Sequence, residues 1–248
     1  MTYCVGIQVN DGLVMVSDSR TNAGVDQVST YSKMWSVGVP GERQFIICSA
    51  GNLATTQAVL NEVKRHAKDQ AETSLMTVAN LADAAAYVGS LSVQEQKKHA
   101  EQSPDSVSNQ MFSSSFIIAG EVDGSECGLY MVYPEGNYIA SSAQAPFLQI
   151  GEIKYGKPIL DRVISGNTDL NRAALCALVS MDGTMRSNLT VGPPIELCIY
   201  NTGSLQPPRY TSFNEDSEYL RQLGKTWNKL LGQAFDQLPA IPLTESSD

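Results

Sequence analysis

The chain has 248 residues, 42% of them hydrophobic, and a net charge of −9. This composition is typical of a globular protein and argues against nucleic acid or an anionic membrane as the main partner. The sequence contains neither a signal-peptide pattern nor a run of about 18 apolar residues, so we expect a cytoplasmic protein with no membrane partner.

The cysteines are scattered along the chain without C-x-x-C spacing, and their number, 5, is odd. Both features argue against a disulfide framework and against a zinc site. We therefore expect the cysteines to be small buried hydrophobic residues.

The first fifth of the chain predicts a β-hairpin followed by two more strands. Asn10-Asp11-Gly12 supplies the turn of the hairpin, and a loop of small residues over 21–30 separates it from the later strands. We expect all four strands to be consecutive members of one sheet. The predicted strands are 3–8, 13–17, 34–39 and 45–50.

Two amphipathic helices are predicted next, over 53–67 with Asn52 as N-cap and over 78–88. Strand patterns then return, and a second sheet is their simplest explanation. The predicted strands of this sheet are 115–121, 129–133, 138–141 and 146–151.

The last part of the chain predicts two helices, two strands and a final helix. Their ranges are 158–164, 170–181, 195–200, 209–213 and 216–231. Strands, two helices, strands and two helices together predict an α+β fold, a four-layer αββα sandwich with the helices outside. We expect a single domain over 1–238 and a flexible acidic tail over 239–248.

The sequence offers few of the usual catalytic motifs. Gly151 to Lys157 fits G-x-x-x-x-G-K, but Pro158 stands where a phosphate-binding loop needs Ser or Thr, so we interpret it as a loop entering a helix at Pro158. No G-x-S-x-G motif or zinc spacing occurs. The only histidines, His66 and His99, lie on predicted helices among charged residues, where we expect them to face water. A hydrolase would therefore need another base.

An α-amine is such a base, since its ordinary pKa is about 8. Met1-Thr2 would supply amine and hydroxyl on one residue once Met1 is removed, and the strand that starts directly afterwards would hold both. Asp18 ends the paired strand near Thr2, and Lys33 needs an anion, for which Asp18 is the local choice. The charge of Lys33 would lower the pKa of the Thr2 hydroxyl and keep the amine neutral.

Several short motifs follow one another in an order that resembles proteasome β-subunits. They are Thr2, Asp18-Ser19-Arg20, Ala23-Gly24, Lys33 and Ser49-Ala50-Gly51. The sequence resembles Anbu, a bacterial family of proteasome-related peptidases. The resemblance implies an N-terminal-nucleophile hydrolase fold, a peptide or protein substrate, self-association into a ring or helical washer, and no metal or organic cofactor.

The resemblance also implies roles for single residues. Thr2 would be the nucleophile, with Asp18 and Lys33 as its charged support, and the Gly51 N–H would face the oxyanion. Gly51 suits that role because it stands between a predicted strand and a helix N-terminus. Further supporting candidates are Ser19, Arg20, Ser187 and Thr190.

The family's later Asp-x-x-Ser element has no clean counterpart. The segment from Ser187 to Thr190 takes its place without a carboxylate, and Asp182 is a nearby alternative. Glu152 stands close to where the family has an additional serine, and its charge would alter the surroundings of the amine.

The predicted function is threonine-dependent hydrolysis of peptide bonds. Two alternatives remain. The chain could hydrolyse a small amide with the same fold and nucleophile, or it could be a non-catalytic assembly subunit of the proteasome α kind. Subunits of that kind carry an extension ahead of the first strand, and we expect none here.

Overall fold

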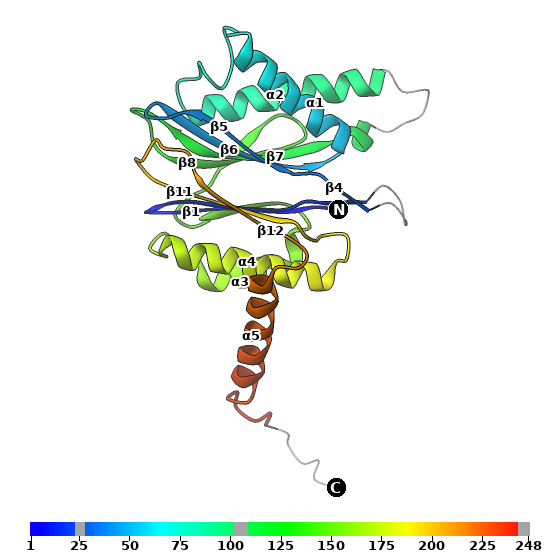
Figure 1. Cartoon of the computed structure of the whole chain (residues 1–248), viewed down its shortest axis with the longest axis vertical. Coiled ribbons are helices and arrows are strands. Elements are labelled where there is room, and N and C mark those ends of the chain that lie inside the picture. Colours follow the sequence, from blue (N-terminus) through cyan, green and yellow to red (C-terminus); the bar gives the residue numbers. More distant parts are fainter. Residues whose placement is uncertain (23–27, 102–108, 243–248) are drawn as a thin grey trace. The chain divides into compact units, whose positions relative to one another are not determined.

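The computed structural model describes residues 1–22, 28–101 and 109–242. These residues divide into two compact units, Met1–Glu215 and Asp216–Asp248, each of which is described by itself. In the first unit two five-stranded sheets lie face to face, with helices on their outer faces (Figure 1). The predicted four-layer α+β sandwich is therefore confirmed.

The first sheet has the strand order β10-β1-β2-β11-β12, with every neighbouring pair antiparallel. Its centre is the predicted hairpin, in which Cys4 pairs with Ser17 and Val9 with Gly12. The apolar, β-branched residues of the hairpin suit a strand pair that is buried almost throughout. The strands are β1 (Tyr3–Val9), β2 (Gly12–Asp18), β10 (Phe147–Gly151), β11 (Ile195–Asn201) and β12 (Arg209–Phe213).

The second sheet has the order β5-β6-β7-β8-β9 and is also antiparallel. The predicted single sheet of four consecutive strands is wrong, because later strands β10 and β11 occupy the edges of the first hairpin. Pairing over long sequence distances decides sheet membership, and local patterns do not reveal it. The strands are β5 (Met34–Val39), β6 (Arg43–Gly51), β7 (Ser114–Val122), β8 (Gly128–Val132) and β9 (Tyr138–Ala140).

The predicted loop over 21–30 contains a small hairpin of its own. Strand β3 (Arg20–Asn22) pairs with β4 (Val28–Thr30). Three residue pairs of this ladder lie within the described residues, and strands this short give no clear alternating pattern in the sequence. Ala23-Gly24 of the predicted motif lies outside the described residues.

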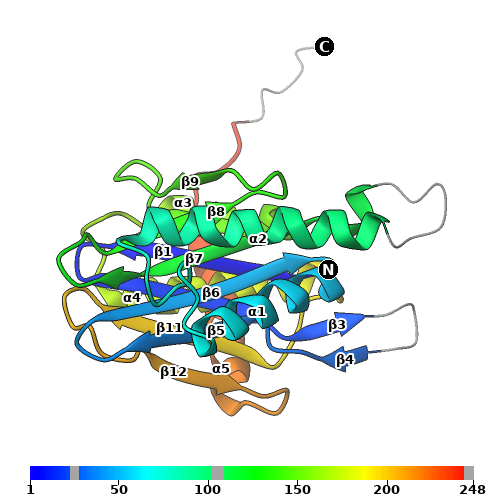
Figure 2. The same ribbon diagram turned by 90° about the horizontal axis from the view of Figure 1, so that it is seen from above.

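Helices α1 (Leu53–Lys68) and α2 (Leu81–Glu101) cover the outer face of the second sheet (Figure 2). Asn52 caps α1 as predicted, since its side chain accepts a hydrogen bond from the Thr55 N–H at 3.0 Å. Helix α2 begins later and extends 13 residues beyond the predicted end at Val88, to Glu101. Its polar C-terminal half lacks the apolar stripe on which the prediction depended.

Helices α3 (Ile153–Val163) and α4 (Leu170–Ser187) form the fourth layer, over the first sheet. The predicted start at Pro158 is wrong because α3 begins at Ile153 and keeps the proline inside. Gly156 is buried ahead of the proline, so the packing of α3 against the rest of the first unit outweighs the preference of proline for a first turn.

The core between the two sheets follows from side-chain alternation along the strands. Ile46 and Cys48 of β6 face the first sheet, whereas Phe45 and Ile47 face α1 and α2. Four of the 5 cysteines are buried, Cys127 is half-buried, and all are free thiols, in line with the predicted role. In the described ranges, no helix is long and apolar enough to cross a membrane.

The second unit is formed around α5 (Glu218–Phe235), which the Ser217 hydroxyl caps by accepting a hydrogen bond from the Leu220 N–H. The predicted helix over 216–231 is thus present and ends later. Residues 243–248 of the predicted tail lie outside the described residues. The predicted domain over 1–238 spans both units, and its extent stays a prediction.

Candidate active site

Thr2 stands at the start of β1, and neighbouring backbone holds it there. Its carbonyl accepts a hydrogen bond from the Glu152 N–H at 2.7 Å, directly beyond the pair that Tyr3 forms with Gly151 of β10. Gly151 has a φ of +84°, and a Cβ at this position would lie 2.0 Å from the Thr2 carbonyl oxygen. Only glycine therefore allows β10 to approach Thr2 so closely.

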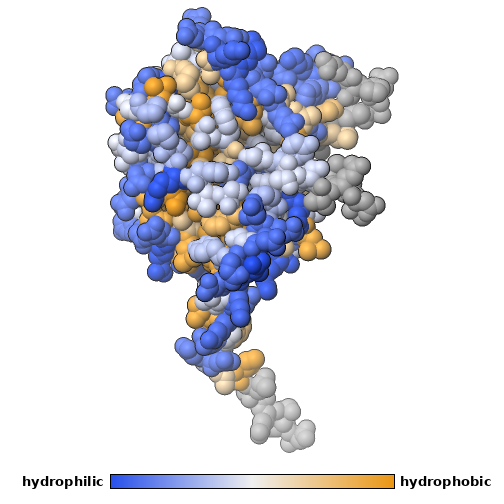
Figure 3. All heavy atoms as spheres, in the orientation of Figure 1, coloured by the Kyte–Doolittle hydropathy of each residue, from blue (hydrophilic) through white to orange (hydrophobic). Residues whose placement is uncertain are grey.

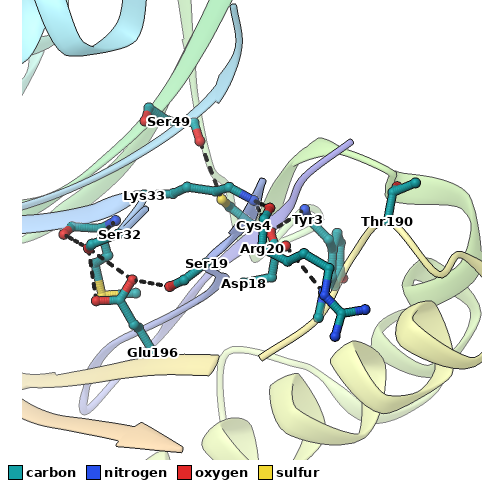
Figure 4. Close-up of polar contacts among 12 residues, drawn as sticks. Tyr3, Cys4, Asp18, Ser19, Arg20, Ser32, Lys33, Ser49, Thr190 and Glu196 are labelled. Carbon is teal, nitrogen blue, oxygen red and sulfur yellow. Dashed lines mark hydrogen bonds and ion pairs between the residues drawn. The ribbon is translucent and has the colours of Figure 1, made fainter. Parts of the chain in front are cut away.

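Asp18 and Lys33 form the ion pair that the sequence predicts. Lys33 Nζ lies 2.8 Å from Asp18 Oδ1 and also donates to the Arg20 carbonyl at 2.6 Å. The same Asp18 oxygen accepts from the Tyr3 N–H at 3.0 Å, and Oδ2 accepts from the Gly192 N–H at 3.3 Å. Figure 4 shows Lys33 pointing toward Asp18 and Tyr3, so the pair contacts the residue that directly follows Thr2.

Burial sets the electrostatics of this pair. Asp18 is 0% exposed and Lys33 6% exposed. Burial raises the pKa of Asp18, and the Lys33 ammonium together with the Tyr3 and Gly192 N–H groups opposes that rise. Each charge needs the other, because a single charge left at this depth would be strongly unfavourable. The pair thus fixes a positive charge close to the start of β1.

Gly51 closes β6 and precedes the capped start of α1. Its φ is +110°, and a Cβ would lie 2.3 Å from the Ser113 carbonyl oxygen, so the turn requires glycine. Gly51, Thr2 and Lys33 all line one cavity of about 420 Å³. The structure therefore brings three of the four predicted catalytic residues to one cavity, with Asp18 behind Lys33.

The two residues after Asp18 support their surroundings in different ways. Ser19 Oγ donates to Glu196 Oε2 at 2.9 Å. Arg20 donates from its guanidinium to the Leu189 carbonyl at 2.9 Å, and its N–H reaches the Gly192 carbonyl at 3.3 Å. Arg20 thereby holds the loop whose Gly192 N–H contacts Asp18.

The segment proposed in place of Asp-x-x-Ser divides into two parts. Ser187 is the last residue of α4, and its hydroxyl donates to the Gly183 carbonyl at 3.0 Å. The predicted end of this helix at Met181 is wrong, because α4 continues to Ser187. Asp182 of the same helix forms an ion pair with Arg186 at 3.9 Å.

Thr190 lies in the loop, where its hydroxyl donates to Asn188 Oδ1 at 2.6 Å. Asn188 in turn donates from Nδ2 to Glu152 Oε2 at 2.8 Å. Asn188 thus links Thr190 to the residue whose backbone holds Thr2. Asn188 is not among the predicted site residues, because an asparagine in a polar loop gives no signal of such a contact.

Glu196 was also missed. It is 4% exposed and accepts hydrogen bonds from Ser19, Ser32 and Tyr210. A carboxylate inside the apolar run Ile195–Asn201 was the available signal, because a buried carboxylate needs donors from elsewhere in the fold.

The two histidines bridge the helices of the outer layer. His66 Nδ1 lies 2.9 Å from the Tyr87 hydroxyl, and His99 Nδ1 lies 3.1 Å from Thr55 Oγ1. Both are half-buried, so the expectation that they face water is wrong. Helices α1 and α2 pack together, and polar side chains between them find partners there. Within the described ranges, no three His, Cys, Asp or Glu side chains group as metal ligands.

Comparison with known proteins gives a consistent result. Residues 2–200 match the Proteasome family, described as proteasome subunit. No protein of the curated set matches the sequence.

Solved structures match over almost the whole chain. Anbu (ancestral beta-subunit) from Yersinia bercovieri is 40% identical, with a TM-score of 0.90 over 98% of this chain and 100% of that chain. The helical assembly of the Anbu complex from Pseudomonas aeruginosa is 41% identical, with a TM-score of 0.89 over 97% of this chain and 98% of that chain. A Gly-1 mutant of Anbu from Hyphomicrobium sp. strain MC1 is 40% identical, with a TM-score of 0.90 and coverage of 98% and 100%.

Proposed function

Since the chain belongs to the proteasome subunit family and, within it, to the Anbu proteins, we propose that it is a threonine-dependent peptidase. Thr2 becomes the reacting residue once Met1 has been removed. The strongest support is that Thr2, Lys33 and Gly51 line one cavity while Asp18 holds Lys33 from behind.

The reaction begins at Thr2. The free α-amine, directly or through a water, takes the proton of the hydroxyl, and Oγ1 attacks the carbonyl carbon of the substrate. The tetrahedral oxyanion forms beside Gly51, whose N–H stabilises it at the N-terminal end of α1. The amine then gives the proton to the leaving nitrogen, and the C–N bond breaks. Water hydrolyses the remaining ester and restores Thr2.

Lys33 makes this chemistry possible near neutral pH. Its positive charge lowers the pKa of the Thr2 hydroxyl and disfavours the protonated amine. Asp18 keeps the ammonium in place through the 2.8 Å contact, and its other oxygen is held by the Gly192 N–H. We assign Asp18 and Lys33 to charge support, and neither exchanges a proton with the substrate.

Glu152, Asn188 and Thr190 have supporting roles on the other side of Thr2. Glu152 fixes the Thr2 carbonyl through its backbone N–H, and Asn188 connects its carboxylate to Thr190. This arrangement takes the place of the family's Asp-x-x-Ser element. Ser187 is excluded from it because its hydroxyl is bound within α4.

The cavity wall indicates the kind of substrate. Leu53 and Leu60 of α1 line it together with Ala50, and among the described residues that line it Lys33 is the one with a charged side chain. Such a wall favours an uncharged side chain next to the cleaved bond.

Self-association is the second part of the proposal. The Pseudomonas aeruginosa relative forms a helical assembly, and apolar side chains remain on the surface of this chain (Figure 3). Ile153, Tyr155 and Leu175 of α3 and α4 are between 37% and 47% exposed. Apolar residues on the outer helices suit burial between copies.

Labelling with a threonine-directed electrophile tests the nucleophile. We expect free-amine protein to be labelled at Thr2, Thr2→Ser to keep part of that reactivity, and Thr2→Ala to lose it. Protein with an uncleaved residue ahead of Thr2 should also stay unlabelled, while its assembly persists. Equal labelling of blocked and free-amine protein, located by mass spectrometry of the N-terminal peptide, would mean that another base operates.

Sizing of the native protein separates the alternatives. A peptidase of this family is expected to elute far above the mass of a dimer, whereas a stable monomer at micromolar concentration would favour the small-amide hydrolase. A large assembly that never labels at Thr2, even with Met1 removed, would favour the non-catalytic subunit.

A further inference from the structure

A second buried carboxylate lies behind the Asp18–Lys33 pair. Glu196 of β11 accepts hydrogen bonds from Ser19 Oγ at 2.9 Å, Ser32 Oγ at 2.9 Å and the Tyr210 hydroxyl at 2.7 Å. Figure 4 shows Glu196 between Ser19 and Ser32, with their hydroxyls turned toward it. Ser19 follows Asp18 in the chain and Ser32 precedes Lys33, so one carboxylate contacts both segments that carry the ion pair.

The position of Glu196 explains why such a connection is needed. Asp18 ends β2 of the first sheet, whereas Lys33 directly precedes β5 of the second. Glu196 pairs with Ser17 across β11 and β2, at the same end of the first sheet as Asp18. Its contact with Ser32 therefore joins the two sheets at the end that holds Thr2.

From this geometry we propose that Glu196 is a positioning residue for the Asp18–Lys33 pair and acts through Ser19 and Ser32. The inference rests on the proposed function, in which that pair supports Thr2. Lys33 Nζ must lie within hydrogen-bond reach of Asp18 and the Arg20 carbonyl at once, at 2.8 and 2.6 Å. A shift of about 1 Å between the sheets would break this arrangement, and shifts of that size can lower rates about 100-fold.

The hydrogen-bond donors around Glu196 agree with this role. An ionised carboxylate only accepts, and the three hydroxyls around Glu196 are all able to donate. The Tyr210 hydroxyl remains a donor far above neutral pH, because burial and the Glu196 carboxylate raise its pKa to about 12. Ser32 Oγ also lies 2.8 Å from the Met34 carbonyl, so its single proton is shared between two acceptors.

The chain supplies a matched control in Glu121 of β7. Glu121 is 8% exposed and accepts from the Tyr200 hydroxyl at 2.7 Å and the Gly203 N–H at 2.8 Å. Tyr200 pairs with Leu13, near the opposite end of β2 from Asp18. Glu121 is thus a buried glutamate with a tyrosine donor, and that tyrosine lies near the opposite end of the first sheet from Asp18.

The experiment compares Glu196→Ala, Glu196→Gln, Glu121→Ala and the wild type, all as full chains with Met1 removed. Three quantities are measured: the maximal rate of Thr2 labelling, the electrophile concentration at half that rate, and the acetylation rate of Lys33 with acetic anhydride. Mass spectrometry gives all three. Acetylation does not depend on catalysis, so it tests the positioning even if Thr2 is never labelled.

We expect Glu196→Ala to lower the maximal rate at least about tenfold and to increase Lys33 acetylation, since Lys33 loses its fixed place. The half-saturating concentration should stay nearly unchanged, because Glu196 is not among the residues that line the cavity. Glu196→Gln should recover much of the rate, since it keeps one acceptor and the shape. Glu121→Ala should lower the free energy of unfolding about as much as Glu196→Ala, but it should leave Thr2 labelling and Lys33 acetylation unchanged.

The inference is overturned if Glu196→Ala and Glu121→Ala are labelled at Thr2 at equal rates and if Lys33 is acetylated at equal rates in both. A wild type that is never labelled would remove the proposed function, and Lys33 acetylation would still decide whether Glu196 positions the pair. If Glu196→Ala fails to fold, the double variant Ser19→Ala/Ser32→Ala replaces it, with the same expected loss of maximal rate and of Lys33 protection.

Discussion

Lys33 Nζ and Asp18 Oδ1 lie 2.8 Å apart, and the same carboxylate oxygen accepts the Tyr3 N–H at 3.0 Å. The first peptide N–H after Thr2 and the ammonium therefore share one acceptor. This shared acceptor fixes the position of the Lys33 charge relative to the start of β1.

Replacing Lys33 tests this relationship. We expect Lys33→Ala to remain folded but to lose Thr2 labelling, and to be destabilised by about 3 kcal/mol because Asp18 would be left as an unpaired buried charge. Denaturant unfolding and labelling by mass spectrometry measure the two effects. Lys157→Ala is the control, since Lys157 lies in an exposed ion pair on α3. Unchanged labelling in Lys33→Ala would reduce the pair to a structural role.

The pH dependence of labelling should report the base. The rate is expected to rise with pH as the α-amine loses its proton, with a midpoint below the ordinary value of about 8 because Lys33 disfavours a second positive charge. Thr2→Ser should show the same midpoint at a lower rate, since the base is unchanged. A midpoint that moves with the nucleophile would contradict an amine base.

Stability at alkaline pH should depend on Tyr3. Burial raises the pKa of its hydroxyl from 10.0 to about 12, while Ser180 and Gln149 hydrogen-bond it. Between these values the folded state keeps a proton that the unfolded state has lost. The contribution of Tyr3 is thus complete below pH 10 and is lost as the pH rises toward 12.

The corresponding slope is about 1.4 kcal/mol per pH unit for one proton. Tyr3→Phe should remove it while costing about 1 kcal/mol at neutral pH from the lost hydrogen bonds. Denaturant unfolding of both proteins from pH 8 upward provides the measurement, and parallel curves would disprove the assignment.

Gly51→Ala should be destabilising beyond the usual cost of its backbone conformation. Both Gly51 and Gly41 have positive φ, but a Cβ at Gly51 meets the Ser113 carbonyl, whereas nothing lies within 4 Å of one at Gly41. We expect Gly41→Ala to cost about 1 kcal/mol and Gly51→Ala more than twice that. Equal losses in thermal or denaturant unfolding would show that the backbone at Ser113 moves aside.

The contact between Asp18 and Lys33 could be predicted because both residues stand at strand ends within 15 positions of each other. The same kind of reasoning predicted the first hairpin and the cap of α1. These features depend on neighbours along the chain, and sequence patterns describe such neighbours directly.

The contacts of Glu152 and Glu196 could not be predicted in this way. Ser19 and Glu196 are 177 positions apart, and Glu152 reaches Asn188 across α3 and α4. Their pairing depends on which strands share a sheet, and the prediction of one four-stranded sheet was wrong. The predicted start of α3 was wrong for a similar reason. Local preference places Pro158 in the first turn, but the packing of Gly156 lets α3 begin before the proline.

The partners that hold the start of β1 come from late in the chain. Gly151 and Glu152 contact Tyr3 and Thr2, and Gly192 contacts Asp18. During synthesis these partners leave the ribosome more than a hundred residues after Thr2. In the proposed function, a growing chain that has lost Met1 would therefore carry a terminal threonine before the contacts that hold it in the site have formed.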